Sequence, residues 1–545
     1  MKLSTLIIII LTTPLWALAQ FSISGTVTDK ESGKTLPGAH VIIDETFLST
    51  STGFDGAFVF KKLKPGKHSV KVSFVGYKAV VRDVELNVDL VLDFDLVYSS
   101  VLSEEVIVRA TRAQQKSPTA YSTVTKEQIN ENNTGQDLPY IMQMTPSVVT
   151  TSDAGGGVGY TGIRIRGTDI TRINVTMNGV PINDAESQNV YFVDLPDLAS
   201  SINNIQVQRG VGTSTNGAAA FGASINIQTT KLNADPYAEL NSAAGSFNTF
   251  KNTLNFGSGL INGKWAFDGR LSAINSDGYI ERASSNLNSF YISGGYYGEK
   301  SILKAIISSG REKTYQAWYG TPKDSLKTNR RYSPSGAMYD SEGLVGYYDN
   351  QTDNYRQDYY QLHFAHQFNK NLSLSSAVFY TKGNGYYENF KNDRSYEDYG
   401  FEDVIVGDST ITETNLVNQK WLDNDYVGVN VSINYNRNKI DLVFGAGANY
   451  YDGDHYGYII WAGHASNSFI DKPWYENTGK KDDGNIFGKV NYQITKKLNL
   501  YGDIQFRRIN YSIVGTHDDL RDLTQSHDFN FFNPKAGAYY SLNEN

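Results

Sequence analysis

The sequence of 545 residues contains no cysteine, which excludes a fold held together by disulfide bonds. Beyond the first twenty residues, it also lacks any stretch of the roughly 18 apolar residues that a membrane-spanning helix requires. Basic residues are not in excess, because the formal net charge is -8, whereas a nucleic-acid-binding protein would show clustered Lys and Arg. These absences disfavour a disulfide scaffold, a helical membrane protein and a nucleic-acid-binding protein.

The first residues carry the pattern of an export signal. Lys2 precedes an apolar run from Leu6 to Leu11, and Ala17 and Ala19 form an A-x-A cleavage site. We therefore predict a signal peptide over residues 1–19. An exported chain without cysteine or a spanning helix is either a soluble secreted protein or a membrane β-barrel.

Composition favours the barrel. Aromatic residues make up 13% of the chain, and there are 49 Gly but only 13 Pro. Membrane barrels need aromatic girdles and alternating apolar and polar residues, which keeps their hydropathy low. A mean hydropathy of -0.40 therefore fits a barrel, and the length predicts several domains.

Residues 20–99 alternate short β-rich runs with turns, which predicts a small β-sandwich. The pattern G-x-V-x-D from Gly25, then L-P-G-A from Leu36 and S-F-V-G-Y ending at Tyr77 resembles the carboxypeptidase regulatory-like domain. The resemblance implies an accessory, structural module rather than a catalytic one. As an N-terminal extension, it fits receptors of the Bacteroidetes type.

Residues 115–232 contain four motifs in a fixed order. They are Arg164-Ile165-Arg166-Gly167, Asn178-Gly179-Val180-Pro181, Ile205-Gln206-Val207-Gln208-Arg209-Gly210 and Gly222-Ala223-Ser224-Ile225-Asn226-Ile227. The series resembles the plug domain of TonB-dependent outer-membrane receptors. Asn-Gly between apolar runs independently predicts a hairpin turn.

The resemblance implies that Arg166 and Arg209 face acidic side chains on the barrel wall and hold the plug in place. A bidentate Arg–carboxylate pair can do this and still reorganise. A purely plug-internal role is the alternative. The family's aromatic-Gly step after the last R-G is replaced here by residues 213–217, which leaves the subfamily and its substrate open.

Residues 102–111, between the two modules, resemble a TonB box, which pairs with the inner-membrane protein TonB. An acidic pair precedes three β-branched residues: Glu104, Glu105, Val106, Ile107 and Val108. The resemblance implies pairing by β-augmentation, in which an extended segment adds to a sheet edge by main-chain hydrogen bonds. A last strand of the sandwich is the alternative reading.

Residues 236–545 alternate apolar and polar side chains, which predicts β-strands with one lipid-facing face. Every second link is short, and three others are long: residues 313–356, 383–421 and 452–482. Short periplasmic turns and long external loops are typical of outer-membrane barrels. We therefore predict an all-β transmembrane barrel with an N-terminal plug and a small β-sandwich.

The strand count sets a second expectation. About twelve strands would close to a radius of roughly 12 Å, whereas a plug of this length has a radius of gyration of about 14 Å. The resemblance implies a barrel of 22 strands, so we expect a C-terminally truncated chain.

Candidate sites outside these motifs are few. We predict no catalytic constellation, no cofactor and no metal site. The run from Asp452 to His455, expected in a loop, could bind Ca²⁺ but better fits a solvated loop tip. The expected loop aromatics could form a stacking platform or an interfacial girdle: Tyr315, Trp318, Tyr319, Tyr386, Tyr387, Tyr458, Trp461, Trp474 and Tyr475.

The resemblance implies active import of a scarce solute across the outer membrane, with TonB and membrane lipid as partners and the plug on the periplasmic side. A ferric siderophore complex is the first expectation for the solute. Cobalamin, haem or an oligosaccharide are alternatives, and a passive porin or an adhesin is the alternative from another class. A surface lipoprotein partner stays open.

Overall fold

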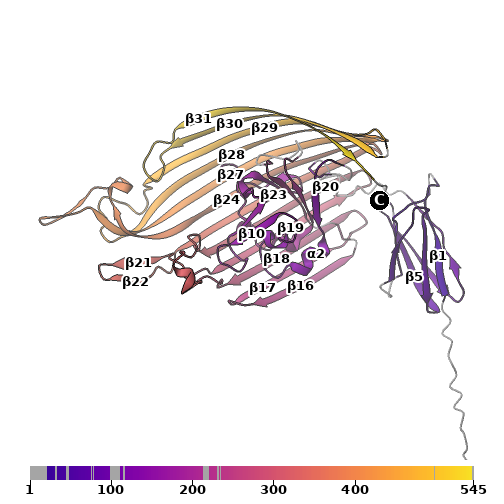
Figure 1. The fold of residues 1–545 in the computed structure, drawn as a ribbon, viewed down its shortest axis with the longest axis horizontal. Coiled ribbons are helices and arrows are strands. Elements are labelled where there is room, and N and C mark those ends of the chain that lie inside the picture. Colours follow the sequence, from indigo (N-terminus) through magenta and orange to yellow (C-terminus); the bar gives the residue numbers. More distant parts are fainter. Residues whose placement is uncertain are drawn as a thin grey trace, which may run out of the picture. The chain divides into compact units, whose positions relative to one another are not determined.

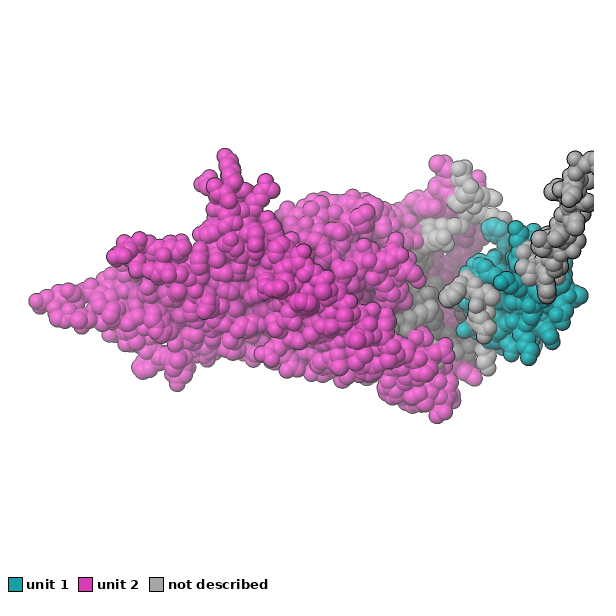
Figure 2. All heavy atoms as spheres, turned by 90° about the horizontal axis from the view of Figure 1, so that it is seen from below, with its two compact units in different colours: residues 1–103 teal, residues 104–545 magenta. Residues whose placement is uncertain are grey.

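The computed structural model describes residues 21–30, 33–43, 48–74, 77, 79–97, 111–113, 117–212, 220–229, 232–233, 235–495 and 497–542. The chain divides into two compact units, residues 1–103 and residues 104–545, coloured teal and magenta in Figure 2. The predicted signal peptide and residues 102–110 of the predicted TonB box lie outside the described residues. None of the described helices is long and apolar enough to cross a membrane.

The first unit is the β-sandwich expected from the sequence. One sheet has the order β4-β1-β7, with β8 also paired to β1, and the other has the order β3-β2-β5-β6. Alternate residues of β1, such as Ile23 and Val27, are fully buried in the core beside Phe58 and Phe94. The strands are β1 Phe21–Asp29, β2 His40–Ile43, β3 Leu48–Ser51, β4 Ala57–Leu63, β5 Gly66–Ser73, β6 Val80–Leu86, β7 Leu90–Val91 and β8 Phe94–Leu96.

The second unit begins with the plug, a five-stranded sheet of order β13-β12-β15-β14-β9 with short helices. Its elements are β9 Tyr121–Val124, α2 Lys126–Asn132, α3 Leu138–Ile141, β10 Val148–Ser152, β11 Thr161–Ile165, η1 Ile170–Arg172, β12 Ile173–Met177, β13 Val180–Pro181, η2 Phe192–Asp194, η3 Leu198–Ser201, β14 Ile202–Arg209 and β15 Ala223–Thr229. Strands β12 and β15 run parallel, and every residue of both is buried. Helix α2 begins at a capping box formed by Thr125 and Gln128.

The rest of the second unit is one antiparallel sheet of twelve strands, here termed the wall, which runs in order from β16 to β31. Its strands are β16 Pro236–Gly245, β17 Thr249–Ser258, β18 Trp265–Ser276, β19 Ser285–Tyr297, β20 Ser301–Tyr315, β23 Thr352–Asn369, β24 Leu372–Ser395, β27 Glu413–Arg437, β28 Ile440–Ala462, β29 Tyr475–Gln493, β30 Leu498–Gly515 and β31 Gln525–Tyr540. In the order of the described strands, β16 and β31 are the two ends and do not pair, so the sheet is open. The predicted fold class is confirmed.

Alternation along each strand gives the wall two different faces. In β27, Val429 and Val431 are 38% and 39% exposed, whereas Ser432 and Asn434 are 6% and 1% exposed. The apolar face is the one that lipid requires. The polar face lies against the plug, around which the sheet curves (Figure 1).

The predicted alternation of short and long links is present, but the long links are shorter than expected. They span residues 316–351, 396–412 and 463–474, because β24, β27 and β28 continue for 24, 25 and 23 residues. Continued antiparallel pairing satisfies backbone hydrogen-bonding groups well past the alternating stretch. The polar composition of these extensions explains why the sequence predicted loops there.

Candidate ligand-binding site

A cavity of about 550 Å³ lies between the plug and the wall, at the end of the sheet that carries the long links. This loop-side cavity is lined by plug residues between 153 and 194 and by wall strands from β20 to β29. Its charged and aromatic residues are Asp153, Tyr160, Asp184, Glu186, Tyr191, Asp194, Glu312, Trp318, Asp353, Tyr355, Tyr359, Tyr386, Tyr387, Lys420, Trp421, His455 and Tyr475. The volume is in the range of small-molecule pockets.

The plug supplies the floor of this cavity through two segments. Tyr160 comes directly before β11, and Asp194 is the last residue of η2. A Cβ atom at Gly310 of β20 would overlap the carbonyl of Asp194. Glycine at this position therefore allows η2 to lie directly against the wall, with Asp194 at the cavity.

Three carboxylates from separate segments meet at the floor. Asp194, Glu312 of β20 and Asp353 of β23 are 5%, 1% and 8% exposed. The Tyr160 hydroxyl is placed to donate a hydrogen bond to Glu312 at 3.2 Å and to Asp353. The Oδ1 atom of Asp194 has no hydrogen-bond partner. Burial, and then the nearby Asp353 carboxylate, raise the pKa of Asp194 well above its ordinary value.

Aromatic rings form the sides of the cavity. Trp318 packs edge-on against Tyr160 at 5.4 Å and against Tyr387 at 5.6 Å between ring centroids. Tyr386 of β24 and Trp421 of β27 lie 4.5 Å apart. Such rings offer both faces and edges to a flat ligand group.

The two basic side chains of the lining already have acidic partners. Lys420 forms an ion pair with Asp518, and His455 Nε2 lies 2.7 Å from Glu186 Oε2. The lining contains six carboxylates against one Lys and one His. The loop-side cavity is therefore acidic in character.

A second contact anchors the plug to the wall close to η2. Asp197 Oδ1 lies 2.7 Å from Lys251 Nζ of β17, and both side chains are almost fully buried. Thr253 and Ser272 donate hydroxyl hydrogen bonds to Asp197 Oδ2 at 2.5 and 2.7 Å. Arg270 donates to the Asp197 carbonyl. Here a plug acid is held by wall cations.

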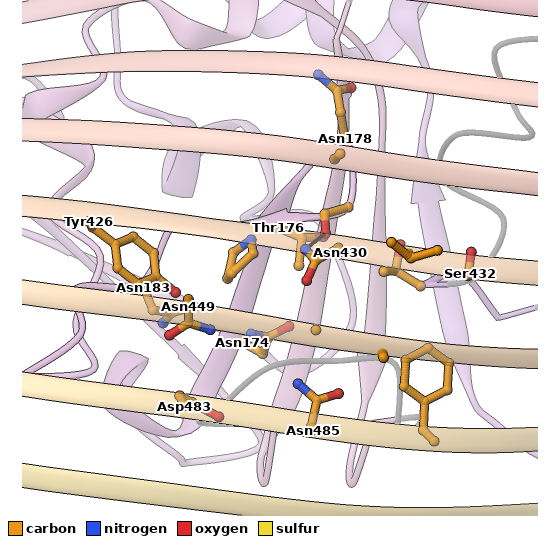
Figure 3. A pocket seen from close by; sticks show the side chains of 18 of the residues that line it. Asn174, Thr176, Asn178, Asn183, Tyr426, Asn430, Ser432, Asn449, Asp483 and Asn485 are labelled. Carbon is orange, nitrogen blue, oxygen red and sulfur yellow. Dashed lines mark hydrogen bonds between the residues drawn. The ribbon is translucent and has the colours of Figure 1, made fainter.

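A smaller cavity of about 100 Å³, the plug–wall cavity, lies deeper between β12–β13 and strands β24 to β30 (Figure 3). Amide side chains line both of its sides, among them Asn174 and Asn183 of the plug and Asn449 and Asn485 of the wall. Direct bonds across it are few: Asn430 Nδ2 donates to the Gly179 carbonyl at 3.3 Å. A polar interface of this kind can exchange protein contacts for water contacts at low cost.

The structure places the predicted plug residues in two groups. Asn178 and Gly179, with φ of 55° and 82°, form the predicted turn between β12 and β13. Asn178 also bonds Thr229 of β15 through its side chain. The second group consists of the motif arginines and glycines: Arg164, Arg166, Gly167, Arg209 and Gly210.

Arg164 and Arg166 are exposed, as is Gly167. Arg166 lies beside Gly210, so the first and third motifs meet. Arg209 Nη1 donates to the Ser122 hydroxyl of β9 at 3.0 Å, within the plug. Neither Arg166 nor Arg209 forms an ion pair with a described acid of the wall. Their proposed role at the barrel wall stays a prediction.

The other predicted sites are placed as follows. Glu104, Glu105, Val106, Ile107 and Val108 lie outside the described residues. Of the aromatic platform, Trp318, Tyr386, Tyr387 and Tyr475 line the loop-side cavity. Tyr386 and Tyr387 belong to β24 rather than to a loop, because that strand continues to Ser395.

The predicted loop position of residues 452–455 is wrong, because they lie within β28. There, Asp454 accepts a hydrogen bond from Thr478 at 2.6 Å, and Asp452 pairs with Lys480 at 3.2 Å. These contacts are cross-strand pairs, which explains the polar residues without an ion. Among the described residues, one group has three potential metal ligands close together, His517, Asp518 and Asp519, but Asp518 is already paired with Lys420.

Comparison with known proteins identifies both modules. The model of the carboxypeptidase D regulatory-like domain matches residues 23–108, and that of the TonB-dependent receptor plug domain matches residues 113–224. Residues 113–224 thus carry the plug domain of TonB-dependent receptors, preceded by a regulatory-like module.

Two curated relatives of this receptor come from Formosa agariphila. TonB-dependent receptor P26 is 28% identical over 363 residues, which cover 60% of this chain and 35% of the relative. TonB-dependent receptor P3 is 24% identical over 54% of this chain and 30% of its own length. The receptor chain thus spans about a third of the length of these relatives.

Solved structures share the receptor's fold. The ferric-catecholate import receptor Fiu from Escherichia coli K12 matches with a TM-score of 0.57 and 14% identity, over 79% of this chain and 68% of its own. The ferric yersiniabactin uptake receptor FyuA from Yersinia pestis gives a TM-score of 0.58 and 10% identity, over 80% and 65%. At these identities the likeness concerns the fold alone.

The sequence did not point to the carboxylates at the cavity floor. Asp194, Glu312 and Asp353 belong to no motif, and they come from three distant parts of the receptor chain. Inward-facing polar residues are common on every strand of a barrel. Only the packing of η2 against β20 selects these three.

Proposed function

We propose that the chain acts in TonB-dependent import of a scarce solute across the outer membrane, and that the solute is a ferric siderophore complex. The loop-side cavity is the observation that carries this proposal. Residues of the plug and of the wall line it together, so a bound solute contacts both the part that must move and the part that stays in the bilayer. We propose no catalytic residue.

Energy enters, in this proposal, through residues 104–108 and reaches the plug through the segment that follows. Ala113 N–H donates to Gln206 Oε1 at 2.8 Å, and Gln206 Nε2 donates back to the Ala113 carbonyl at 3.1 Å. Gln208 Nε2 donates to the Thr111 carbonyl at 2.9 Å. Both glutamines belong to β14, so tension on residues 104–110 would act directly on the plug sheet.

Two observations support a ferric cargo. The aromatic sides of the cavity, such as Trp318 and Tyr387, suit the flat chelating groups of many siderophores. Receptors of the same fold, Fiu and FyuA, are named for ferric chelates. Cobalamin, haem and oligosaccharides remain the alternatives, since all present rings that aromatic side chains can contact.

The coupling role is tested by Ile107→Pro. Proline cannot donate the main-chain hydrogen bond that strand addition requires, so we expect uptake to be abolished while ligand binding to intact cells is unchanged. Uptake and binding of a radiolabelled ferric complex give the two readouts. Ile107→Val, which keeps strand pairing, is the matched control and should transport normally. Normal uptake by the proline variant would overturn the assignment of residues 104–108.

The cargo class is tested by transcript level. Genes for iron uptake are induced when iron is scarce, so we expect a strong rise of this receptor's transcript in iron-starved cells compared with iron-replete cells. An unchanged level would argue against both a siderophore and haem. The search would then turn to vitamins and glycans.

A further inference from the structure

The floor of the loop-side cavity holds more buried negative charge than the protein itself compensates. Asp194, Glu312 and Asp353 each expose less than a tenth of their surface. Among the ion pairs of the described residues, none involves these three carboxylates. The nearby basic groups of the lining, Lys420 and His455, are paired with Asp518 and Glu186.

Hydrogen bonds satisfy this cluster only in part. The single Tyr160 hydroxyl proton can go to either Glu312 or Asp353, and Thr314 donates to Glu312 Oε2 at 3.1 Å. Asp194 lines the cavity and its carboxyl hydrogen-bonds with that of Glu312, but its buried Oδ1 atom accepts no hydrogen bond from an N–H or hydroxyl donor. Burying a carboxylate oxygen without a donor is costly, so this oxygen at the cavity floor is a ready acceptor for an N–H group.

Close burial of like charges has two physical outcomes. The carboxylates either take up protons or bind a cation, because three uncompensated charges cannot share a dry site. The raised pKa of Asp194, caused first by burial and then by Asp353, belongs to the protonated resting state. A cationic ligand would replace these protons.

The distances between the carboxylates favour a larger cation over a single metal ion. Among the described residues, His517, Asp518 and Asp519 form the single group whose ligand atoms all lie within 4.8 Å of one another. The ligand atoms of Asp194, Glu312 and Asp353 do not all lie within this distance of one another. One metal ion would therefore not contact all three. An ammonium or guanidinium group has several N–H donors and can reach acceptors that are further apart.

We propose that Asp194, Glu312 and Asp353 bind a protonated amine or guanidinium group of the transported solute, so that the receptor selects a cationic complex over a neutral one. This inference rests on the proposed function, because it assumes that the loop-side cavity holds the cargo. Asp194 comes from the plug and the other two from the wall. The cationic group would thus join the plug and the wall, while the aromatic sides contact the rest of the solute.

The test uses two ligands that differ only in charge. One is the ferric complex of a linear trihydroxamate with a free terminal amine, and the other is the same complex after N-acetylation of that amine. With purified receptor in detergent, we expect the amine form to bind about tenfold tighter or more. In Asp194→Asn and in Glu312→Gln, this preference should fall towards one.

Each variant carries its own folding control. Binding of the acetylated complex should be the same in wild type and variants, since it does not use the carboxylates. Asp408→Asn, which removes an exposed charge in the 396–412 link outside the cavity, should keep the full preference.

The outcomes separate this inference from the proposed function. Equal affinity of wild type for both complexes would overturn the cation site and leave siderophore import standing. If the protein binds neither ferric complex, the ferric cargo is overturned, and the iron-free amine and its acetylated form would then be compared. A preference for the amine that is lost in Asp194→Asn would support the site. The absence of a preference would overturn it. Calcium binding that is lost in Asp194→Asn, without any preference for the amine, would also overturn it.

Discussion

Asp194 and Asp197 lie three residues apart at the same junction between plug and wall, yet their surroundings are opposite. Asp197 is surrounded by Lys251, Arg270 and three hydroxyl donors. Although burial opposes its ionisation, Arg270 and Lys251 outweigh burial and lower the pKa of Asp197 to about 2. Asp194 has acidic neighbours instead, and its pKa is raised. One carboxylate is thus an anchor, and the other is left for a ligand.

This contrast shows how a plug can be held in place by one carboxylate while a nearby carboxylate stays without a counter-charge at the cavity floor. The two sites use the same residue type, similar burial and neighbouring positions in the chain. What differs is the strand that faces each of them: β17 and β18 supply cations and hydroxyls, whereas β20 and β23 supply further acids.

The largest difference between Asp194 and Asp197 is expected when the counter-charge of Asp197 is removed. Lys251→Met removes the ion-pair partner of the buried Asp197 and leaves only Arg270 and the hydroxyl donors around it, so we expect the plug to lose about 3–5 kcal/mol of stability. Asp194→Asn is the matched control, because it removes a charge that has no counter-ion, and stability should be unchanged or higher. Hydrogen exchange of helix α2 and chemical unfolding would measure both. Equal losses in the two variants would contradict the contrast.

A smaller effect, the pH dependence of plug stability, also distinguishes Asp194 from Asp197. The raised pKa of Asp194 means that the folded plug binds a proton more tightly than the unfolded chain, so this group's stabilisation is lost as pH rises above its ordinary range. The lowered pKa of Asp197 gives the reverse sign, with stabilisation lost as pH falls towards about 2.

We therefore expect unfolding of the wild-type plug to become easier as the pH rises above the ordinary range of a carboxyl group. The Asp353, Asp184 and Asp137 charges also raise the pKa of Asp194, whereas a hydrogen bond with Glu312 lowers it. In Asp194→Asn this change should be reduced, whereas the loss of stability in strong acid should persist. A wild-type plug that is equally stable within and above this range would contradict the assignment.

The sequence predicted the wall well because alternation is a local property. The hairpins, the faces of β27 and the Asn178–Gly179 turn all follow from neighbouring residues. Strand ends were predicted less well, since the pairing of β24 with β27 continues through polar residues that resemble a loop. Resemblance to a known plug supplied the domain, whereas the role of its arginines stays a prediction.

The site could not be predicted in the same way. The floor depends on Gly310 allowing η2 to approach β20, a contact between segments with no shared sequence pattern. The aromatic residues were recognised as candidates, but only the tertiary structure shows that Trp318 and Tyr387 line the cavity. Charge imbalance in a cavity is visible only after every ion pair has been assigned.

The position of β9 has a mechanical consequence. It is the edge strand of the plug sheet, it follows the segment clamped by Gln206, and it pairs with β14 through only four residue pairs. A pulling force applied ahead of Ala113 would load this edge first and peel it away one hydrogen bond at a time, at a lower peak force than shearing the buried strands β12 and β15 together. The plug would then yield stepwise from one side while its centre stays folded, and would refold onto an intact template when the tension ends.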